Sequence, residues 1–323
     1  MGTIEAVEIQ RFDPLMRDVA MPRTALFHPA GFPLRLTTNS RDVIEAGAES
    51  WDEWPAEFDT PPIEMRVLVE PEGELAGPPR FRMQGHLIQA VGDAHNFAVA
   101  DTRALFASIC VSARTAADHS VLRWFYLESL GYLLLAQRYL TAIHAACVAR
   151  NGSGILLCGV STAGKSTLAF ACARAGFTYV SDDCVWLLNG AAERVALGRP
   201  HHIRFRQDAS RHFPELEGQL ARARPNGKIA IELSTRALPH IATARRAPIG
   251  AIVFLVRDSQ GEARLDAMAP EEALTLLLRD LPSYDEEVNA IQRATVERAA
   301  DAPAFRLHYQ SLEDGVRLLS QLS

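Results

Sequence analysis

Eight consecutive residues near the middle of the chain have the types and spacing of a phosphate-binding loop. The segment GVSTAGKS, residues 159–166, fits the pattern G-x-x-x-x-G-K-[ST]. Its two glycines let the backbone turn tightly, so that successive N–H groups point inward toward an anion. We expect Lys165 to reach the β- and γ-phosphates of ATP and the hydroxyl of Ser166 to bind Mg²⁺. The expected nucleotide contacts are Gly159, Val160, Ser161, Thr162, Ala163, Gly164, Lys165, Ser166 and Thr167.

The elements on either side of this loop supply the context that a chance glycine-rich turn would lack. Residues 155–158 (ILLC) form a short apolar run typical of a buried parallel strand. We expect a helix over residues 165–174, whose N-terminus adds partial positive charge beside the phosphates. Strand, loop and helix together predict a nucleotide site.

Two adjacent carboxylates, Asp182 and Asp183, follow a second β-like segment at residues 177–180. A carboxylate at a strand end beside a phosphate loop suits a Mg²⁺ ligand or a general base. Neighbouring residues of a strand point to opposite faces, so the two should have different roles. We assign Asp182 to the metal with Ser166, and Asp183 to the reacting phosphate. A solvated Asp-Asp turn is the alternative.

This loop–helix–strand unit ending in Asp-Asp resembles the catalytic domain of bacterial HPr kinase/phosphorylase. The resemblance implies that Asp183 accepts the proton of a substrate hydroxyl and that His144, in the segment AIHAACV, assists it. It also implies that Lys228, after the Pro225–Gly227 turn, contacts the reacting phosphate. A buried core histidine and an ordinary hairpin lysine are the alternatives for His144 and Lys228.

The resemblance covers about residues 140–260 and is incomplete. The family's Glu-Ile-Arg-Gly segment, which completes Mg²⁺ binding, is not found here. The nearest candidate, residues 198–206 (GRPHHIRFR), has histidine where the glutamate would fall. The family is also distantly similar to phosphoenolpyruvate carboxykinases, which leaves a small-metabolite acceptor open.

Composition limits the class of protein. The 323 residues are 48% hydrophobic and 22% charged, with a formal net charge of −6, which argues against a nucleic-acid or anionic-membrane partner. The N-terminal residues 1–15 lack the basic start and apolar core of a signal peptide. Five cysteines without C-x-x-C spacing indicate reduced thiols. These features predict a cytoplasmic protein.

Two domains are expected. Residues 1–115 have the pattern of a smaller, strand-rich α+β domain for recognition or assembly, with a helix over residues 41–51. Its expected strands are residues 63–70, 87–91, 96–100 and 107–111. A helix over residues 117–139 should connect it to the catalytic domain, residues 116–323.

The catalytic domain is expected to be an α/β P-loop kinase domain of the HPr kinase and phosphoenolpyruvate carboxykinase type. Residues 249–256 (IGAIVFLV) form an apolar run typical of a central strand. We expect helices over residues 270–279 and 283–299, the second with a capping box of Ser283 and Glu286. Residues 305–309 should return as a strand, with Ser311 capping a final helix.

The most basic stretch, residues 199–212, has two interpretations. Its arginines and histidines either form a solvated face or hold an acidic or phosphorylated substrate. Arg204 is the residue that we would test first.

The favoured function is an ATP-dependent phosphotransferase, a serine kinase acting on a protein or peptide hydroxyl. A small-metabolite acceptor ranks second. The rival class is a nucleotide-binding regulatory or scaffold protein without phosphoryl transfer. The resemblance also implies a homo-oligomer as a candidate state.

Overall fold

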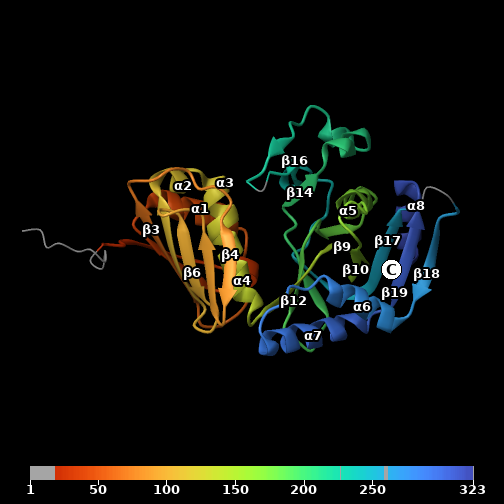
Figure 1. Cartoon of the computed structure of the whole chain (residues 1–323). Helices are drawn as coiled ribbons and strands as arrows, with labels where there is room; N and C mark the ends of the chain where they lie inside the picture. The colour runs from red at the N-terminus through yellow and green to blue at the C-terminus, as the bar shows by residue number, and fades with distance from the viewer. Residues whose placement is uncertain (1–18, 226, 258–260, 323) are drawn as a thin grey trace, which may run out of the picture.

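The computed structural model describes residues 19–225, 227–257 and 261–322 in three β-sheets with helices around them (Figure 1). The N-terminal segment that we inspected for a targeting signal, residues 1–15, lies outside the described residues. The fold is mixed α/β, which agrees with the expected class at that level.

The first sheet, called the N-terminal sheet here, has seven strands. In spatial order they are β1 (Arg23–Phe27), β2 (Leu34–Thr38), β3 (Ile63–Glu70), β7 (Phe106–Ser112), β6 (Phe97–Asp101), β5 (Leu87–Val91) and β4 (Arg80–Gln84). The four expected strands are all present, and α1 (Arg41–Trp51) forms where expected. Most neighbours are antiparallel, but β3 runs parallel to both β2 and β7. Helix α1 lies between β2 and β3 in the chain and supplies the crossover that such a parallel pair needs.

The expected helix over residues 117–139 forms as one uninterrupted helical run over residues 119–136. It consists of α3 (His119–Leu122), a π-helical segment (Arg123–Leu127) and α4 (Glu128–Ala136), and the short helix α2 (Ala113–Ala117) precedes it. Asp118 separates α2 from α3, and its side chain caps α3 by accepting the backbone N–H of Val121. These helices share one buried core with the N-terminal sheet. We therefore propose a division between the two parts after α4, instead of at residue 116.

The second sheet, called the central sheet, has nine strands. Seven lie in the order β11 (Thr178–Ser181), β9 (Ala145–Arg150), β10 (Ser153–Cys158), β17 (Arg246–Arg257), β13 (Val195–Leu197), β12 (Val185–Leu188) and β8 (Leu140–Ile143), while β19 (Ala304–Tyr309) pairs with β17 and β18 (Arg264–Met268) pairs with β19. Strands β10, β17 and β19 are parallel neighbours. The apolar run at residues 249–256 thus belongs to the middle of this sheet, as predicted.

Helices cover both faces of the central sheet. One core contains side chains of α5 (Lys165–Arg174) and α8 (Leu312–Leu319), and the other contains those of α6 (Pro270–Arg279) and α7 (Glu286–Ala300). Along β10, Ile155 and Leu157 enter the first core while Leu156 and Cys158 enter the second. This two-sided burial explains why the strand has an unbroken apolar sequence.

The caps of the last two helices differ in how well they were predicted. Ser311 accepts the backbone N–H of Asp314 and caps α8, as expected. The predicted capping box of Ser283 and Glu286 is wrong. Asp285 caps α7 instead, by accepting the N–H of Val288 at 3.0 Å. A carboxylate at this position also interacts favourably with the helix dipole.

The third sheet, called the small sheet, consists of β14 (His202–Phe205), β16 (Ile229–Ser234) and β15 (Arg222–Ala223) in that order. It stands above the central sheet in Figure 1. Short 3-10 helices complete the fold: η1 (Pro29–Gly31), η3 (Gln207–Arg211), η4 (Pro214–Leu216), η5 (Thr235–Ala237) and η6 (Ser320–Leu322).

An ionic network centred on Glu128 joins the α4 side to the central sheet. One oxygen of Glu128 lies 3.1 Å from Arg123 and the other lies 3.0 Å from Arg199, which follows β13. Burial opposes the ionisation of Glu128, but the two guanidinium groups lower its pKa to about 2. Beside this network, the ring of Trp186 on β12 stacks on Tyr132 of α4 at 4.7 Å. Charge and aromatic packing therefore hold the two parts together.

Replacing Glu128 with Gln should destabilise the protein strongly, because Arg199 would keep a buried charge without its partner. Removing one member of a buried ion pair costs about 3–5 kcal/mol. Urea unfolding followed by tryptophan fluorescence measures the loss. The control, Glu45→Gln, removes the carboxylate from the exposed Arg41–Glu45 pair, and such pairs contribute roughly 0.5 kcal/mol. Equal losses in the two variants would contradict the assigned role of Glu128.

Candidate active site

The glycine loop, residues 159–166, has the backbone shape of an anion-binding turn. Gly159 has φ 148°, Thr162 φ 82° and Gly164 φ 92°, so three loop residues lie in the left-handed region. A Cβ on Gly164 would come within 2.8 Å of the Tyr309 hydroxyl, which explains the need for glycine there. Helix α5 begins directly after Gly164, at Lys165, so its free N–H groups open onto the loop.

Lys165 is buried with its ammonium group held only by neutral partners. Its Nζ donates to the carbonyl oxygens of Gly159 at 2.8 Å and Val160 at 3.2 Å. Burial lowers the pKa of Lys165, and the charge of Asp183 opposes that shift. Within the described residues no carboxylate oxygen lies within 4 Å of this ammonium. A buried cation in this state favours the binding of an anion.

His144 connects Lys165 to Asp183. Its Nε2 lies 3.1 Å from the Lys165 Nζ, and its Nδ1 lies 3.0 Å from the main-chain oxygen of Asp183 and 3.3 Å from the carboxylate Oδ1. An ammonium group only donates, so Nε2 must accept and Nδ1 must carry the proton. The structure thus brings together three of the predicted catalytic residues, and His144 is exposed, unlike a core histidine.

The two adjacent aspartates face different environments, although they lie in a bend after β11 (Thr178–Ser181) and not in the strand that the alternation argument assumed. Asp182 is 5% exposed, whereas the side chain of Asp183 is 58% exposed. The Oδ2 of Asp182 accepts the backbone N–H of Arg204 at 2.8 Å, which ties this turn to β14. Burial raises the pKa of Asp182 to about 6, and Arg204 opposes the shift. Ser166 donates its hydroxyl to the main-chain oxygen of Asp182 at 3.2 Å.

These oxygen donors fit the Mg²⁺ that we expected. A serine hydroxyl and a carboxylate are hard ligands of the kind that Mg²⁺ prefers, with water completing its shell. Ser166 and the second oxygen of Asp182 are the groups that would hold the ion. Their assignment as metal ligands remains a prediction.

Lys228 lies in the connection between β15 and β16 of the small sheet. Its main-chain oxygen accepts the N–H of Arg224 at 2.9 Å, as in a tight hairpin, while the neighbouring Asn226 lies outside the described residues. Its predicted contact with a reacting phosphate remains a prediction.

The residues of the basic stretch at 199–212 have different surroundings. Arg199 belongs to the Glu128 network, and His201 lies 4.0 Å from Glu53. Arg204 pairs with Glu232 at 3.6 Å, across the β14–β16 register, whereas Arg206 and Arg211 are exposed. That this stretch holds an acidic or phosphorylated substrate remains a prediction.

Two residues near the loop were missed from the sequence. The hydroxyl of Tyr309 donates to the main-chain oxygen of Ala163 at 3.1 Å and supports the loop from the end of β19. Asp280, after α6, lines a small cavity with His144 and Gly159. Tyr309 ends a parallel strand, and the carboxyl ends of parallel strands are where ligands bind. That rule would have identified Tyr309, whereas Asp280 has no local signal.

The cysteines are inert thiols by their environment. Cys110, Cys147, Cys158 and Cys172 are buried and Cys184 is half-buried, all as free thiols. Burial raises the pKa of each thiol to about 12, so the reactive thiolate is disfavoured.

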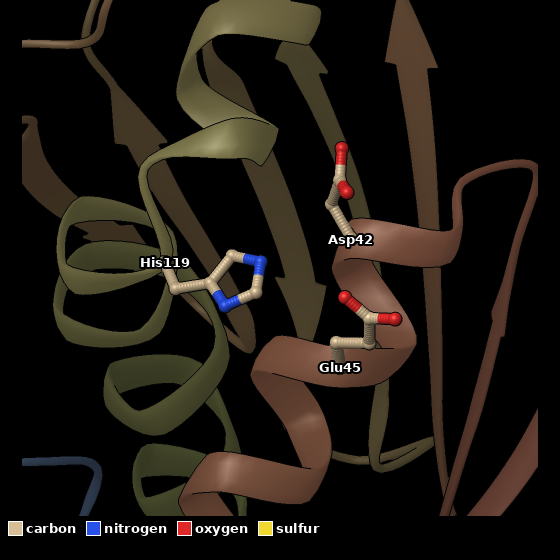
Figure 2. A group of neighbouring side chains, drawn as sticks. All are labelled: Asp42, Glu45 and His119. Atoms are coloured by element: carbon tan, nitrogen blue, oxygen red, sulfur yellow. The ribbon is translucent and has the colours of Figure 1, made fainter.

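A second polar group lies on the helices of the N-terminal sheet. Asp42 and Glu45 on α1 face His119 on α3, with one ligand atom from each within 4.8 Å of the others (Figure 2). His119 Nδ1 lies 2.6 Å from Glu49, and Glu45 pairs with Arg41 at 2.6 Å. Protein partners account for these contacts, so we assign no metal to the group. None of the helices in the described part of the chain is long and apolar enough to cross a membrane.

Comparison with known proteins finds little. No protein-family model matches the chain, and no curated protein matches it. A solved structure of the HPr(Ser) kinase/phosphatase from Coxiella burnetii is 12% identical, covering 56% of this chain and 96% of that one with a TM-score of 0.31. This is a distant structural likeness, too remote to transfer an activity or substrate.

Replacing Asp182 with Asn should stabilise the protein increasingly as the pH rises. A pKa raised from 3.8 to about 6 makes ionisation cost about 3 kcal/mol, at about 1.4 kcal/mol per unit. The favourable contribution of protonated Asp182 is therefore complete below about pH 4 and is lost as the pH rises through about 6. Urea unfolding of both proteins between these pH values measures the difference. A stability difference that is independent of pH would contradict this environment for Asp182.

Proposed function

We propose that this chain is an ATP-dependent phosphotransferase that acts on a hydroxyl group. The observation that carries the proposal is the buried ammonium of Lys165, which lies in a glycine loop at a helix N-terminus and has only neutral partners among the described residues. A nucleotide phosphate is the anion that such a loop accommodates best, because backbone N–H groups and Lys165 can bind it together.

Asp183 is the proposed general base. In the reaction, the acceptor oxygen bonds to the γ-phosphorus while the bond from that phosphorus to the β–γ bridging oxygen breaks, releasing ADP. The hydroxyl proton passes to the Asp183 carboxylate. His144 Nδ1–H donates to the main-chain oxygen of Asp183 and lies 3.3 Å from its carboxylate, while Nε2 faces Lys165. When bound, Mg²⁺ would neutralise phosphate charge, held by Ser166 and Asp182.

Positioning and charge would supply most of the rate enhancement, because phosphoryl transfer requires little covalent chemistry from the protein. Lys165 would stabilise charge on the transferring group, and Lys228 remains a proposed second cation. A serine on a protein or peptide is the first acceptor class, and a small metabolite is the second.

A nucleotide-binding regulator without transfer is the second candidate function. The hydrogen bond from Arg204 to Asp182 favours it, because this bond occupies one of the two carboxylate oxygens and leaves only the other for the expected metal. The exposure of Asp183 and its contact with His144 favour the enzyme, since a base must reach its substrate.

Replacing Lys165 with Ala should abolish ATP binding. We expect wild type to bind ATP with micromolar affinity, about −8 kcal/mol, in calorimetry with Mg²⁺ present. The variant should lose about 100-fold or more, because it removes the only side-chain cation within the loop pattern. Arg174→Ala, at the other end of the same helix, is the matched control and should bind like wild type. Unchanged binding by Lys165→Ala would contradict the proposed site.

Replacing Asp183 with Asn should separate binding from transfer. The variant should bind ATP like wild type, while the slow transfer of phosphate to water should fall by about 100-fold, since loss of a general base costs about 10²–10⁴. Phosphate release from ATP measures the rate. If wild type binds ATP but releases no phosphate, and Asp183→Asn changes nothing, the regulator is the better account.

A further inference from the structure

A large apolar cavity lies between the N-terminal sheet and the central sheet. Its volume is about 660 Å³. Its apolar lining comes from the β4–β5 hairpin, from α4 and from β8 and β12 on the opposite side. The residues are Phe81, Met83, Ile88, Tyr132, Ala142 and Trp186. Both parts of the protein are therefore needed to form it.

The lining of the apolar cavity includes a direct chain neighbour of the proposed general base. Ala142 and Trp186 are register partners in the β8–β12 pair, and both line the cavity. His144 comes two residues after Ala142, and side chains two apart on extended backbone point to the same face. Cys184, which also lines the cavity, directly follows Asp183. A molecule in this cavity would thus have a group within reach of Asp183 and His144.

A second cavity of about 700 Å³ adjoins the first and is basic. Its arginines come from the π-helical segment and from the small sheet: Arg123, Arg204, Arg222 and Arg224. Two of them are neutralised, because Arg123 pairs with Glu128 and Arg204 with Glu232. Within the described chain, Arg222 and Arg224 form no ion pair with a carboxylate. This cavity therefore offers two cations for an anionic ligand.

Trp124 links the two cavities. It lines both of them, and the guanidinium of Arg224 stacks over its ring at 4.1 Å. Trp124 belongs to the π-helical segment, and such segments occur frequently at functional sites. The apolar and basic cavities are thus two halves of one groove, and Cys184, the residue after Asp183, lines the apolar half.

We propose that this groove binds an extended peptide as the phosphoryl acceptor, with a large apolar side chain on one side of its serine and acidic side chains on the other. The proposal rests on the proposed function. Each cavity alone is the size of a small-ligand pocket, about 300–1,000 Å³, but the joined groove exceeds that range. Strand β4, which carries Phe81 and Met83, is also an edge strand of the described sheet. An extended peptide can add to such an edge while its alternate side chains enter the cavity.

Fluorescence anisotropy with labelled serine peptides and the full-length protein tests the proposal. One probe carries acidic residues before the serine and tryptophan after it. A second probe has the reverse order. Comparison peptides replace the acidic residues with lysine, or the tryptophan with alanine. One acidic–aromatic order should bind about tenfold or more tighter than both comparison peptides, because both halves of the groove then contribute. Equal binding of all peptides, or no binding, would overturn the proposal.

Substitutions in the two halves of the groove test whether the peptide binds there. Phe81→Asp should weaken binding of the acidic–aromatic peptide by about tenfold, by placing a charge in the apolar half, and Arg222→Glu should do the same by reversing charge in the basic half. The control is Val91→Asp on the opposite face of the hairpin. Val91 is 46% exposed and Phe81 is 43% exposed, so the two substitutions have similar solvent access. Equal effects of Phe81→Asp and Val91→Asp would overturn the proposal.

The same measurements distinguish the two proposals. Peptide binding is measured without nucleotide, and Lys165→Ala should bind the peptide like wild type but transfer no phosphate to its serine. If the peptide binds while ATP does not, the phosphotransferase proposal fails and the groove remains. If ATP binding depends on Lys165 while no peptide binds, only the acceptor inference fails.

Discussion

The proposed site depends on the free-energy cost of burying the positive charge of Lys165. The Lys165 ammonium has lost most of its contact with water, and two carbonyl oxygens and an imidazole replace only part of that solvation. The carbonyls belong to the glycine loop itself, so the loop and the cation hold one another in place. An arriving phosphate would exchange these neutral partners for an anion. The hydrogen bond from Tyr309 to Ala163 supports the loop from behind, because β19 ends beside it.

In the proposed function, the contact between the two parts of the fold would determine which acceptors can approach this charge. Glu128 and Arg199 form the ionic contact, and Trp186 packs on Tyr132 next to it. The same α4 helix that makes these contacts lines both halves of the groove. Stability and the proposed acceptor recognition therefore share side chains, and we expect substitutions at the contact to alter both. The N-terminal sheet would take part in acceptor recognition through this position.

Local patterns in the sequence predicted the helices and strands. Contacts between residues far apart in the chain could not be predicted in this way. Residues 63–70 alternate apolar and charged side chains, and residues 155–158 are buried on both faces, so each strand is encoded within itself. The glycine loop and the Asp182–Asp183 pair were likewise predicted from residues close together in the sequence. The helix predicted over residues 117–139 forms over residues 119–136, whereas the short helix Ala113–Ala117 before it was not predicted, since Asp118 starts a new helix as its cap. The Arg199–Glu128 pair spans 71 positions, and no pattern in a single sequence reveals such a partner.

The measurement that tests the central claim most directly is a crystal structure with Mg²⁺ and a non-hydrolysable ATP analogue. We expect the β- and γ-phosphates to contact the backbone N–H groups of residues 159–166. The Lys165 Nζ should leave the carbonyls of Gly159 and Val160 for a phosphate oxygen, and the γ-phosphate should face Asp183. An analogue bound elsewhere, or a Lys165 that keeps its present partners beside an occupied loop, would contradict the account.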